Sequence, residues 1–409
     1  MMRVPLLDLT AQLQAIEAEV GAAVADVLRG GHFIMGANVS ALEAELAAYT
    51  GVAHAIGVAN GSDALHLALL AAGVGPGDEV ICPAFTFFAT AGAVARAGAT
   101  PVFADIDPVT YTLSVEDAAR RAGPRTRVII PVHLYGHPAD MDGVMRLAGE
   151  HGLTVIEDTA QAIGATVPDG RRVAGIGHFG TYSFFPSKNL GALGDGGMVV
   201  CADAGLAEKV RLLRVHGASP KYYHRVLGYN SRLDELQAAI LRVKLQRLEA
   251  WTAGRRAAAA RYAKLFAEAG LGAGAAPGAE APGAEAPGAE APPAPPTAQP
   301  PPPAPGDPVV LPAERPGFTH VYHQYTIRVH RRDALQAHLE HCGVGTAVYY
   351  PLPLHLQPVF QELGYRPGDL PITEAACAEV LSLPIFPELT EAQQEYVVAQ
   401  VAGFYAGGG

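Results

Sequence analysis

The chemically most distinctive residue of the sequence is Lys188, which lies between an aromatic apolar run and a glycine-rich turn in SFFPSKNLGALGDGGMVV, residues 183–200. A lysine side chain has a pKa of about 10.4, so it acts as a neutral base at pH 7 only when burial or covalent bonding removes its charge. A surface or ion-paired lysine is the alternative. We expect the other four lysines on polar helix faces or in a polar loop; these are Lys209, Lys221, Lys244 and Lys264.

A second motif is suited to binding a phosphate. In VANGSDALHLALL, residues 58–70, Gly61 and Ser62 follow a strand-like run and open a helical pattern. Free backbone N–H groups, a hydroxyl group and the positive end of the helix would together attract an anion there. An ordinary serine N-cap is the alternative interpretation.

The third motif is LTVIEDTAQAIGA, in which Asp158 ends an apolar strand-like run. A buried carboxylate needs a partner, either a cation or, alternatively, a helix N-terminus or a structural hydrogen bond. A protonated heteroaromatic nitrogen would also satisfy it. A phosphate cradle, an acid for a ring nitrogen and a secluded lysine are together typical of a pyridoxal phosphate site, where the protein supplies a Schiff base, orientation and ring protonation.

Short apolar runs alternate with helical patterns over the first half of the chain. This alternation predicts an α/β fold with a mostly parallel sheet covered on both faces. Ligands of such sheets bind outside the carboxyl ends of the strands, where all three motifs are expected to lie. The strand-like runs are residues 54–59, 78–85, 100–106, 127–134, 153–158, 180–186 and 196–202, and two helical patterns are residues 63–73 and 141–152.

The second half of the chain is organised differently. Residues 232–270 have an amphipathic period that predicts one long helix or two in series. The next segment repeats APGAE three times and has almost no large apolar residue, so we expect a disordered, solvated excursion. Strand-like residues 320–329 and 343–351 and helical residues 331–343 then suggest a small α/β domain. The predicted organisation is a large cofactor-binding domain with an N-terminal helix at 1–250, a connecting helix at 251–270, the Pro/Ala/Gly/Glu-rich excursion at 271–308 and a small C-terminal domain at 309–409.

Composition narrows the class of protein. The 409 residues carry a formal net charge of −11, which argues against nucleic-acid binding. The four cysteines form no C-x-x-C pair, so the sequence predicts neither a metal site nor a disulfide framework. No run has the pattern of a signal peptide or the length of a membrane span, so we expect a cytoplasmic protein without a membrane partner.

Six sequence blocks in order identify a resemblance: residues 36–69, 75–90, 98–113, 155–165, 183–200 and 228–245. In these blocks the chain resembles the DegT/StrS family of sugar aminotransferases. The resemblance implies a type I aspartate-aminotransferase-like fold, with a mostly parallel seven-stranded sheet and a smaller C-terminal α/β domain. It also implies pyridoxal 5′-phosphate as the cofactor.

The family pattern implies roles for the residues around the cofactor ring. Lys188 would form the Schiff base, Asp158 would pair with the pyridine nitrogen, and Gln161 would bond the ring hydroxyl. Phe87 would stack on the ring, although core packing is the alternative for this residue.

The pattern also implies how the phosphate is held. Gly61, Ser62 and Ser183 would bind it within one chain. Asn230 would reach the phosphate of a neighbouring subunit, which implies a homodimer with a shared active site; a turn residue is the alternative for Asn230.

The same resemblance implies a reaction. An amino-acid donor, L-glutamate by family habit, would supply the amino group to a keto-sugar on a nucleotide diphosphate. The sequence is most similar to members that aminate C3 of dTDP- or UDP-linked 3-keto-hexoses, for cell-surface polysaccharide or amino-sugar metabolite biosynthesis. Tyr349, Tyr350 and His355 would line the sugar pocket, with core or interface packing as the alternative, and His216 is a further candidate.

Four other functions compete with amination at C3. Some family members aminate C4, and others replace the lysine by histidine and act as dehydratases; the presence of Lys188 favours transamination. A non-catalytic regulator that binds the cofactor or the sugar nucleotide is the third alternative. A nucleotide-dependent sugar dehydrogenase would need G-x-G-x-x-G between a strand and a helix, and the glycine spacings in this sequence do not fit.

Overall fold

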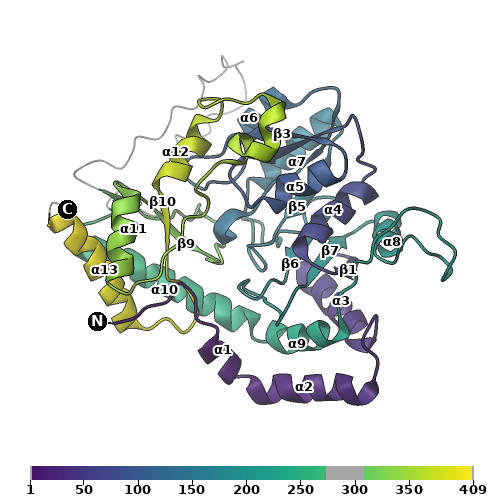
Figure 1. The fold of residues 1–409 in the computed structure, drawn as a ribbon, viewed down its shortest axis with the longest axis horizontal. Helices are drawn as coiled ribbons and strands as arrows, with labels where there is room; N and C mark the ends of the chain where they lie inside the picture. Colours follow the sequence, from purple (N-terminus) through teal and green to yellow (C-terminus); the bar gives the residue numbers. More distant parts are fainter. Residues whose placement is uncertain (1, 273–307, 408–409) are drawn as a thin grey trace.

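The computed structural model describes residues 2–272 and 308–407 (Figure 1). The predicted excursion of residues 271–308 therefore lies almost wholly outside the described residues. The described chain is built around a seven-stranded sheet with the order β1-β7-β6-β5-β4-β2-β3. The strands are β1 (His54–Val58), β2 (Glu79–Pro83), β3 (Thr100–Ala104), β4 (Thr126–Ile129), β5 (Thr154–Asp158), β6 (Phe179–Ser183) and β7 (Gly197–Cys201).

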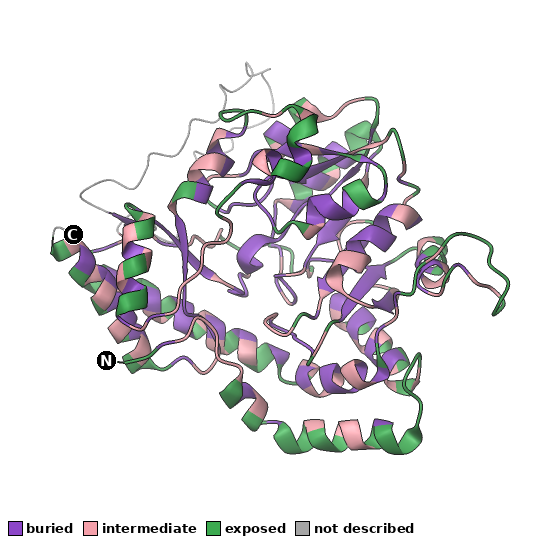
Figure 2. Ribbon diagram, in the orientation of Figure 1, coloured by how far each residue is buried: buried purple, intermediate pink, exposed green. Residues whose placement is uncertain are grey.

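This sheet confirms the prediction of a mostly parallel arrangement. Strands β6, β5, β4, β2 and β3 pair in parallel, whereas β7 runs antiparallel to both of its neighbours. Each strand overlaps one of the seven predicted runs. Almost every position of these strands is withdrawn from water, because helices cover both faces (Figure 2).

Alternate side chains of one strand enter different hydrophobic clusters, as the two-residue period of a strand requires. In β2, Val80 and Cys82 pack into one cluster and Ile81 into another. Helices α4, α5 and α8 supply the first cluster, and α3, α6, α7 and α9 cover the opposite face. These helices are α3 (Ala37–Thr50), α4 (Gly61–Ala71), α5 (Ala89–Arg96), α6 (Val115–Arg121), α7 (Met141–His151), α8 (Ala204–Leu213) and α9 (Glu235–Leu245).

The predicted helical region of residues 232–270 forms two helices in series. Helix α9 ends at Leu245, and α10 (Leu248–Glu268) continues to the C-terminal part of the chain. At the N-terminus, α1 (Thr10–Gln14) leads into α2 (Glu17–Gly30), which packs along α9 (Figure 1). Within residues 2–272 and 308–407, no helix is long and apolar enough to cross a membrane.

The C-terminal part contains a three-stranded antiparallel sheet with the order β10-β9-β8. The predicted strand at residues 343–351 is wrong: this segment forms only isolated bridges, from Val344 to Val4 and from Ala347 to Ser382. It then bends into the cavity described below, so it cannot pair along a sheet edge. The elements are β8 (Val309–Val310), β9 (Tyr325–Val329), β10 (Val380–Leu383), α11 (Arg332–His341), α12 (Pro371–Glu379) and α13 (Glu391–Ala406), with single turns at Leu134–Gly136, Leu354–Leu356 and Pro358–Leu363.

One lysine does not lie where the sequence predicts. Lys209, Lys221 and Lys264 are exposed, but Lys244 of α9 is only 1% exposed. Its Nζ atom donates a hydrogen bond to the carbonyl oxygen of Gly191. The expectation of a polar helix face is therefore wrong for Lys244, because the loop that follows β6 covers this part of α9.

Candidate active site

A cavity of about 730 Å³ opens at the carboxyl ends of the strands, between the seven-stranded sheet and the C-terminal part of the chain. This volume is in the range typical of small-molecule sites. The walls come from loops after the strands and from residues 349–357 and 382–385. The cavity brings together nine of the predicted site residues, namely Gly61, Ser62, Phe87, Asp158, Gln161, Ser183, Lys188, Tyr349 and Tyr350.

Lys188 reaches the cavity from the loop that follows β6. Its backbone N–H donates a 2.8 Å hydrogen bond to the carbonyl oxygen of Phe185, which fixes the turn. Within residues 2–272 and 308–407, the amine has no hydrogen-bond acceptor or ion-pair partner. Burial lowers the pKa of Lys188 to about 8, although the charge of Asp158 acts in the opposite direction. The amine is therefore free to react and gives up its proton more readily than an exposed lysine.

Asp158 ends β5 and is 5% exposed. Its Oδ2 atom accepts a 2.9 Å hydrogen bond from the Thr90 hydroxyl, and Oδ1 accepts one of 3.2 Å from the N–H of Ala160. Burial raises the pKa of Asp158, while these hydrogen bonds and the Lys188 charge oppose the rise. The carboxylate would gain strongly from a cationic partner in the cavity.

The N-terminus of α4 faces Ser183 across a close contact. A Cβ atom added to Gly61 would lie 2.6 Å from the Cβ of Ser183, so only glycine permits this approach. Asn60 caps the helix by accepting a hydrogen bond from the N–H of Asp63. The N–H groups of Gly61 and Ser62 have no acceptor within the described parts of the chain. Two free N–H groups beside two serine hydroxyls form a suitable cradle for a phosphate.

Gln161 links the two parts of the chain across the cavity. Its Oε1 atom accepts a 2.6 Å hydrogen bond from the N–H of Tyr135, so its Nε2 atom is directed toward Tyr350. The distance from Nε2 to the Tyr350 hydroxyl is 3.1 Å. The ring of Phe87 lies 6.3 Å from that of Tyr350 and is 58% exposed, which leaves an aromatic face open to a ligand.

Three predicted residues do not line the cavity of this chain. His355 is buried, and its Nε2 atom lies 3.2 Å from a carboxylate oxygen of Glu374. His216 is exposed, with its backbone oxygen bound to His224. Asn230 is exposed in the segment after α8, where it bridges to Val215.

The cavity also contains residues to which the sequence analysis assigned no role. His323 and Gln324 precede β9, and burial together with the Lys188 charge lowers the pKa of His323 well below its usual range. Thr86 lines the cavity and contacts Thr90, whose hydroxyl reaches Asp158. The AFTFFAT block of the sequence contains both threonines. The sequence does not indicate, however, which group a buried threonine hydroxyl bonds.

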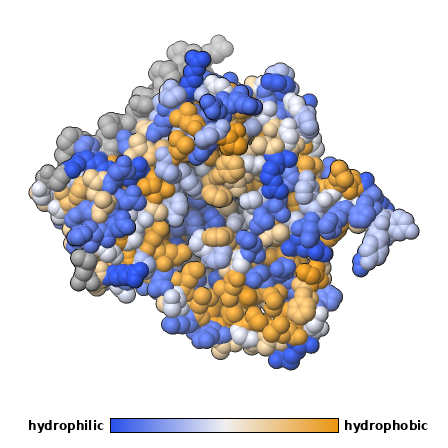
Figure 3. All heavy atoms as spheres, viewed as in Figure 1, coloured by the Kyte–Doolittle hydropathy of each residue, from blue (hydrophilic) through white to orange (hydrophobic). Residues whose placement is uncertain are grey.

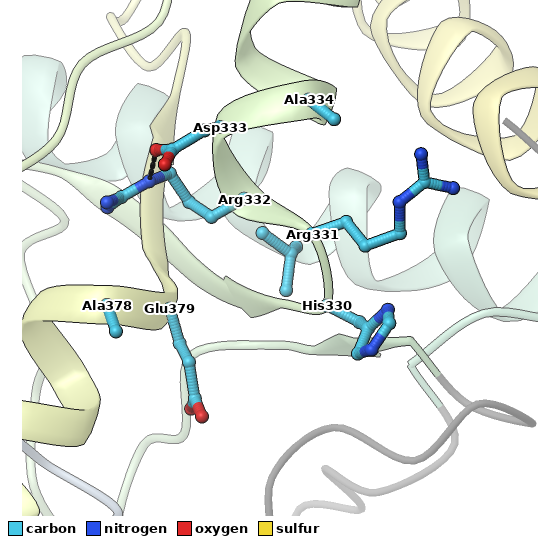
Figure 4. A pocket seen from close by; sticks show the side chains of 8 residues that line it. His330, Arg331, Arg332, Asp333, Ala334, Ala378 and Glu379 are labelled. Atoms are coloured by element: carbon cyan, nitrogen blue, oxygen red, sulfur yellow. Dashed lines mark hydrogen bonds and ion pairs between the residues drawn. The ribbon is translucent and has the colours of Figure 1, made fainter.

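A second, smaller hollow of about 300 Å³ lies at the N-terminal end of α11 (Figure 4). Arg332 bonds Asp333 there and donates to the carbonyl oxygens of Cys377 and Val380. Glu379 pairs with Arg328. Arg332 and Glu379 are therefore paired at this hollow, whereas Lys188 and Asp158 line the larger cavity.

The residues of the larger cavity fit pyridoxal phosphate. A free amine can bond an aldehyde, a buried carboxylate can pair with a ring nitrogen, and the N-terminus of α4 with its glycine contact can hold a phosphate. These groups alone account for the fit to pyridoxal phosphate.

Comparisons with known proteins find relatives that cover almost the whole chain. A chain from Geobacillus stearothermophilus named pleiotropic regulatory protein is 53% identical and covers 99% of each chain. UDP-N-acetyl-3-dehydro-alpha-D-glucosamine 3-aminotransferase of Acidithiobacillus ferrooxidans is 46% identical over 95% of each chain. dTDP-3-amino-3,4,6-trideoxy-alpha-D-glucose transaminase of Streptomyces venezuelae is 43% identical over 98% of this chain and 95% of its own.

The crystal structure of S. venezuelae DesV in complex with a ketimine intermediate is similar, with a TM-score of 0.87 and 41% identity over 99% of both chains. This likeness confirms the fold expected from the resemblance. The sequence pattern of one family matches residues 14–281 and 304–402. The chain therefore belongs to the DegT/DnrJ/EryC1/StrS aminotransferase family.

Proposed function

We propose that this protein is a pyridoxal-phosphate-dependent aminotransferase that moves an amino group from L-glutamate to a keto-sugar on a nucleotide diphosphate. The observation that carries the proposal is the amine of Lys188, which has no partner within the described residues and shares one cavity with the carboxylate of Asp158. When bound, the cofactor supplies an aldehyde and a ring that accepts electrons from the bonds being broken.

The residues of this chain have separate tasks in the proposed reaction. Lys188 would hold the cofactor and then, as a free amine, move a proton from the donor's α-carbon to the cofactor's C4′ carbon. In the second half-reaction it would move a proton from C4′ to the sugar carbon that receives the amino group. A pKa of about 8 suits this task, because a group whose pKa is close to neutral pH can both take up and release a proton.

Asp158 keeps a proton on the ring nitrogen, since its buried negative charge stabilises a positive partner. The N-terminus of α4 and the hydroxyls of Ser62 and Ser183 hold the phosphate. Gln161 would bind the ring hydroxyl through its oriented Nε2 atom, and the exposed ring of Phe87 would stack on the cofactor.

The proposed acceptor is a UDP- or dTDP-linked 3-keto-hexose, used in the synthesis of a polysaccharide or an amino-sugar metabolite. Two similar proteins, at 46% and 43% identity, are named for amination at C3 of such sugars. Tyr349 and Tyr350 would contact the sugar, because they line the cavity from the C-terminal part of the chain.

The reverse reaction tests this assignment. The purified, cofactor-loaded protein is incubated with 2-oxoglutarate and a panel of UDP- and dTDP-linked 3-amino- and 4-amino-hexoses, and glutamate is measured. We expect glutamate with a 3-amino sugar. Formation of glutamate with 4-amino sugars alone would move the reaction to C4, and no glutamate with any sugar would overturn the enzymatic proposal.

We also propose a homodimer in which Asn230 reaches the phosphate site of the second copy. Large apolar side chains remain exposed around α2 and in the loop after α8, which is typical of an interaction surface. Figure 3 shows hydrophobic residues gathered on one face around α9 and α2. The exposed side chains are Leu28, Phe33, Ile34, Met35, Tyr222, Tyr223, Val226 and Leu227.

Mixing two inactive variants tests a shared site. If Asn230 acts across the interface, a mixed dimer of Lys188→Ala and Asn230→Ala chains contains one intact site and one that carries both defects. Unfolding and refolding the two variants together should then restore activity. A monomer by analytical ultracentrifugation, or no restored activity despite mixed dimers, would contradict the proposal.

A regulator that binds the cofactor without turnover is the second candidate, and the name of the 53% identical relative favours it. Addition of L-glutamate separates the two functions. An aminotransferase converts the bound cofactor to its amine form and loses the visible absorbance, whereas a protein that only binds keeps it.

A further inference from the structure

Two threonine hydroxyls form a chain that ends on the Asp158 carboxylate. Thr86 lies in the loop after β2, and Thr90 lies in the first turn of α5. The two Oγ1 atoms are 3.0 Å apart, and Thr90 Oγ1 is 2.9 Å from Asp158 Oδ2. Thr90 is completely buried and Thr86 is 2% exposed, so water does not compete for these bonds.

The direction of donation in this chain follows from the chemistry of the groups. An ionised carboxylate only accepts hydrogen bonds, so Thr90 must donate its single hydroxyl proton to Asp158. Thr90 then has only its lone pairs to offer to Thr86. The proton between the two threonines therefore belongs to Thr86, which makes the relay Thr86 to Thr90 to Asp158.

We propose that Thr90 is a positioning residue that holds Asp158 ionised and directed at the cofactor's ring nitrogen, and that Thr86 orients Thr90 for this task. The proposal rests on the proposed function, because it assigns the ring nitrogen as the partner of Asp158. It goes beyond that function because it gives two residues with no assigned role in cofactor binding a defined effect on the protonation of the ring nitrogen.

The surroundings of Asp158 explain why one hydroxyl has a measurable effect. The titratable groups that face the carboxylate are Lys188 after β6, His133 after β4, Cys82 in β2 and Tyr350 of the C-terminal part. Thr90 and the N–H of Ala160 are the hydrogen-bond donors to its two oxygens in the described structure.

Without the Thr90 hydroxyl, Asp158 Oδ2 would be buried with no donor from the described protein. The ionised carboxylate would lose the hydrogen bond that most strongly offsets its burial, so the pKa of Asp158 would rise. A neutral Asp158 stabilises a protonated ring nitrogen less well, so the ring nitrogen would lose its proton at a lower pH than in the wild type.

The direct test is the ¹⁵N chemical shift of ring-labelled pyridoxal phosphate bound to the wild type and to Thr90→Val, Thr90→Ser and Thr86→Val. Valine keeps the shape of threonine and removes the hydroxyl. We expect Thr90→Val to move the shift toward that of neutral pyridine and to weaken cofactor binding about tenfold or more. Thr90→Ser should restore the wild-type shift, and Thr86→Val should move it in the same direction by a smaller amount.

Thr181→Val is the matched control, because Thr181 is also buried but donates to the backbone oxygen of Glu157. It should leave the shift unchanged. A wild-type shift in Thr90→Val, or equal shifts in Thr90→Val and Thr181→Val, would overturn the relay. If Thr90→Val does not fold, an unchanged shift in Thr86→Val overturns it instead. Failure of the proposed function is separate, since that function is measured as turnover, whereas the ¹⁵N shift requires only that the wild type binds the labelled cofactor.

Discussion

Lys188 and Lys244 differ in their surroundings rather than in their acidity. Burial lowers the pKa of Lys188 and of Lys244 to about 8 in each case. The amine of Lys188 faces a large cavity and has a carboxylate nearby. That of Lys244 lies against the carbonyl oxygen of Gly191 and 5.8 Å from the Trp251 ring centroid.

A lowered lysine pKa therefore indicates that the amine is withdrawn from water. It does not by itself indicate that the lysine reacts with a ligand. The amine of Lys188 faces a cavity with room for a ligand and donates no hydrogen bond to the described residues. The amine of Lys244 instead donates a hydrogen bond that serves a structural contact. The contact is useful to the site, because Gly191 belongs to the loop that carries Lys188. We infer that Lys244 supports the loop and Lys188 reacts, which the following variants can separate.

The largest expected effect is that of Lys188→Ala. Removal of the amine takes away both the bond to the cofactor and the proton carrier, so turnover should fall by at least about 10³-fold. The visible absorbance of the lysine-bound cofactor should disappear from the spectrum. Lys244→Met, which lacks the other buried amine, should keep that absorbance, and retained turnover in Lys188→Ala would exclude the assigned role.

Asp158→Asn should have the next largest effect. Asparagine keeps the shape of the side chain but lacks the charge that holds a proton on the ring, so we expect kcat to fall by about 10²- to 10³-fold. Asp195 is the matched control, because it also lines the cavity but is exposed. An equal loss in Asp195→Asn would show that general negative charge, rather than Asp158 itself, is required.

Lys244→Met should change the pH dependence of stability. The pKa of Lys244 is about 8 in the folded chain and 10.5 as a free side chain, so between these pH values the unfolded chain binds more protons. The free energy of unfolding therefore rises with pH across this window, by on the order of 3 kcal/mol from this residue. Below pH 8 both states are protonated and the contribution is constant.

Urea unfolding of the cofactor-free protein at pH 7.5 and pH 9.5 measures this effect. The increase with pH should be smaller in Lys244→Met than in the wild type, with kcat of the loaded enzyme changed less than about tenfold. The same increase in both proteins would mean that Lys244 is not buried as a charged amine. A collapse of kcat at full stability would instead give Lys244 a role in the reaction.

The smallest effect is expected from Tyr350→Phe, which keeps the ring but removes the hydroxyl beside Gln161. Loss of one neutral hydrogen bond corresponds to about a 2- to 10-fold weaker binding of cofactor or sugar. Equilibrium binding of pyridoxal phosphate and the KM for the sugar measure it. Tyr349→Phe should leave cofactor affinity unchanged, since the Tyr349 hydroxyl interacts with Gln324 rather than with Gln161.

The strands and the main motifs could be predicted because their signals are local. A strand buried on both faces is a continuous apolar run, and all seven such runs correspond to strands of the sheet. Lys188, Asp158 and Gly61 follow or end these runs, so the rule that parallel strands present their carboxyl ends together was enough to bring them to one cavity.

Other features could not be predicted because they depend on segments far apart in the chain. Residues 343–351 have a strand-like composition but meet Val4 and Ser382 only at single bridges. His355 shares a motif with Tyr349 and Tyr350, yet its ring turns to Glu374 and away from the cavity. Asn230 remains a prediction, since its proposed partner belongs to a second copy.

The sequence by itself determined the family and the mostly parallel sheet, and it placed Lys188 and Asp158 at the carboxyl edge of that sheet, because short apolar runs and ordered motifs encode these features locally. Only the tertiary structure decided that Lys244 is buried, that Thr90 bonds Asp158, and that Gln161 meets Tyr350 across 189 residues of chain. The physical reason is that burial and hydrogen bonding depend on which distant segment packs against a side chain, and a side chain's own neighbours in sequence do not specify that segment.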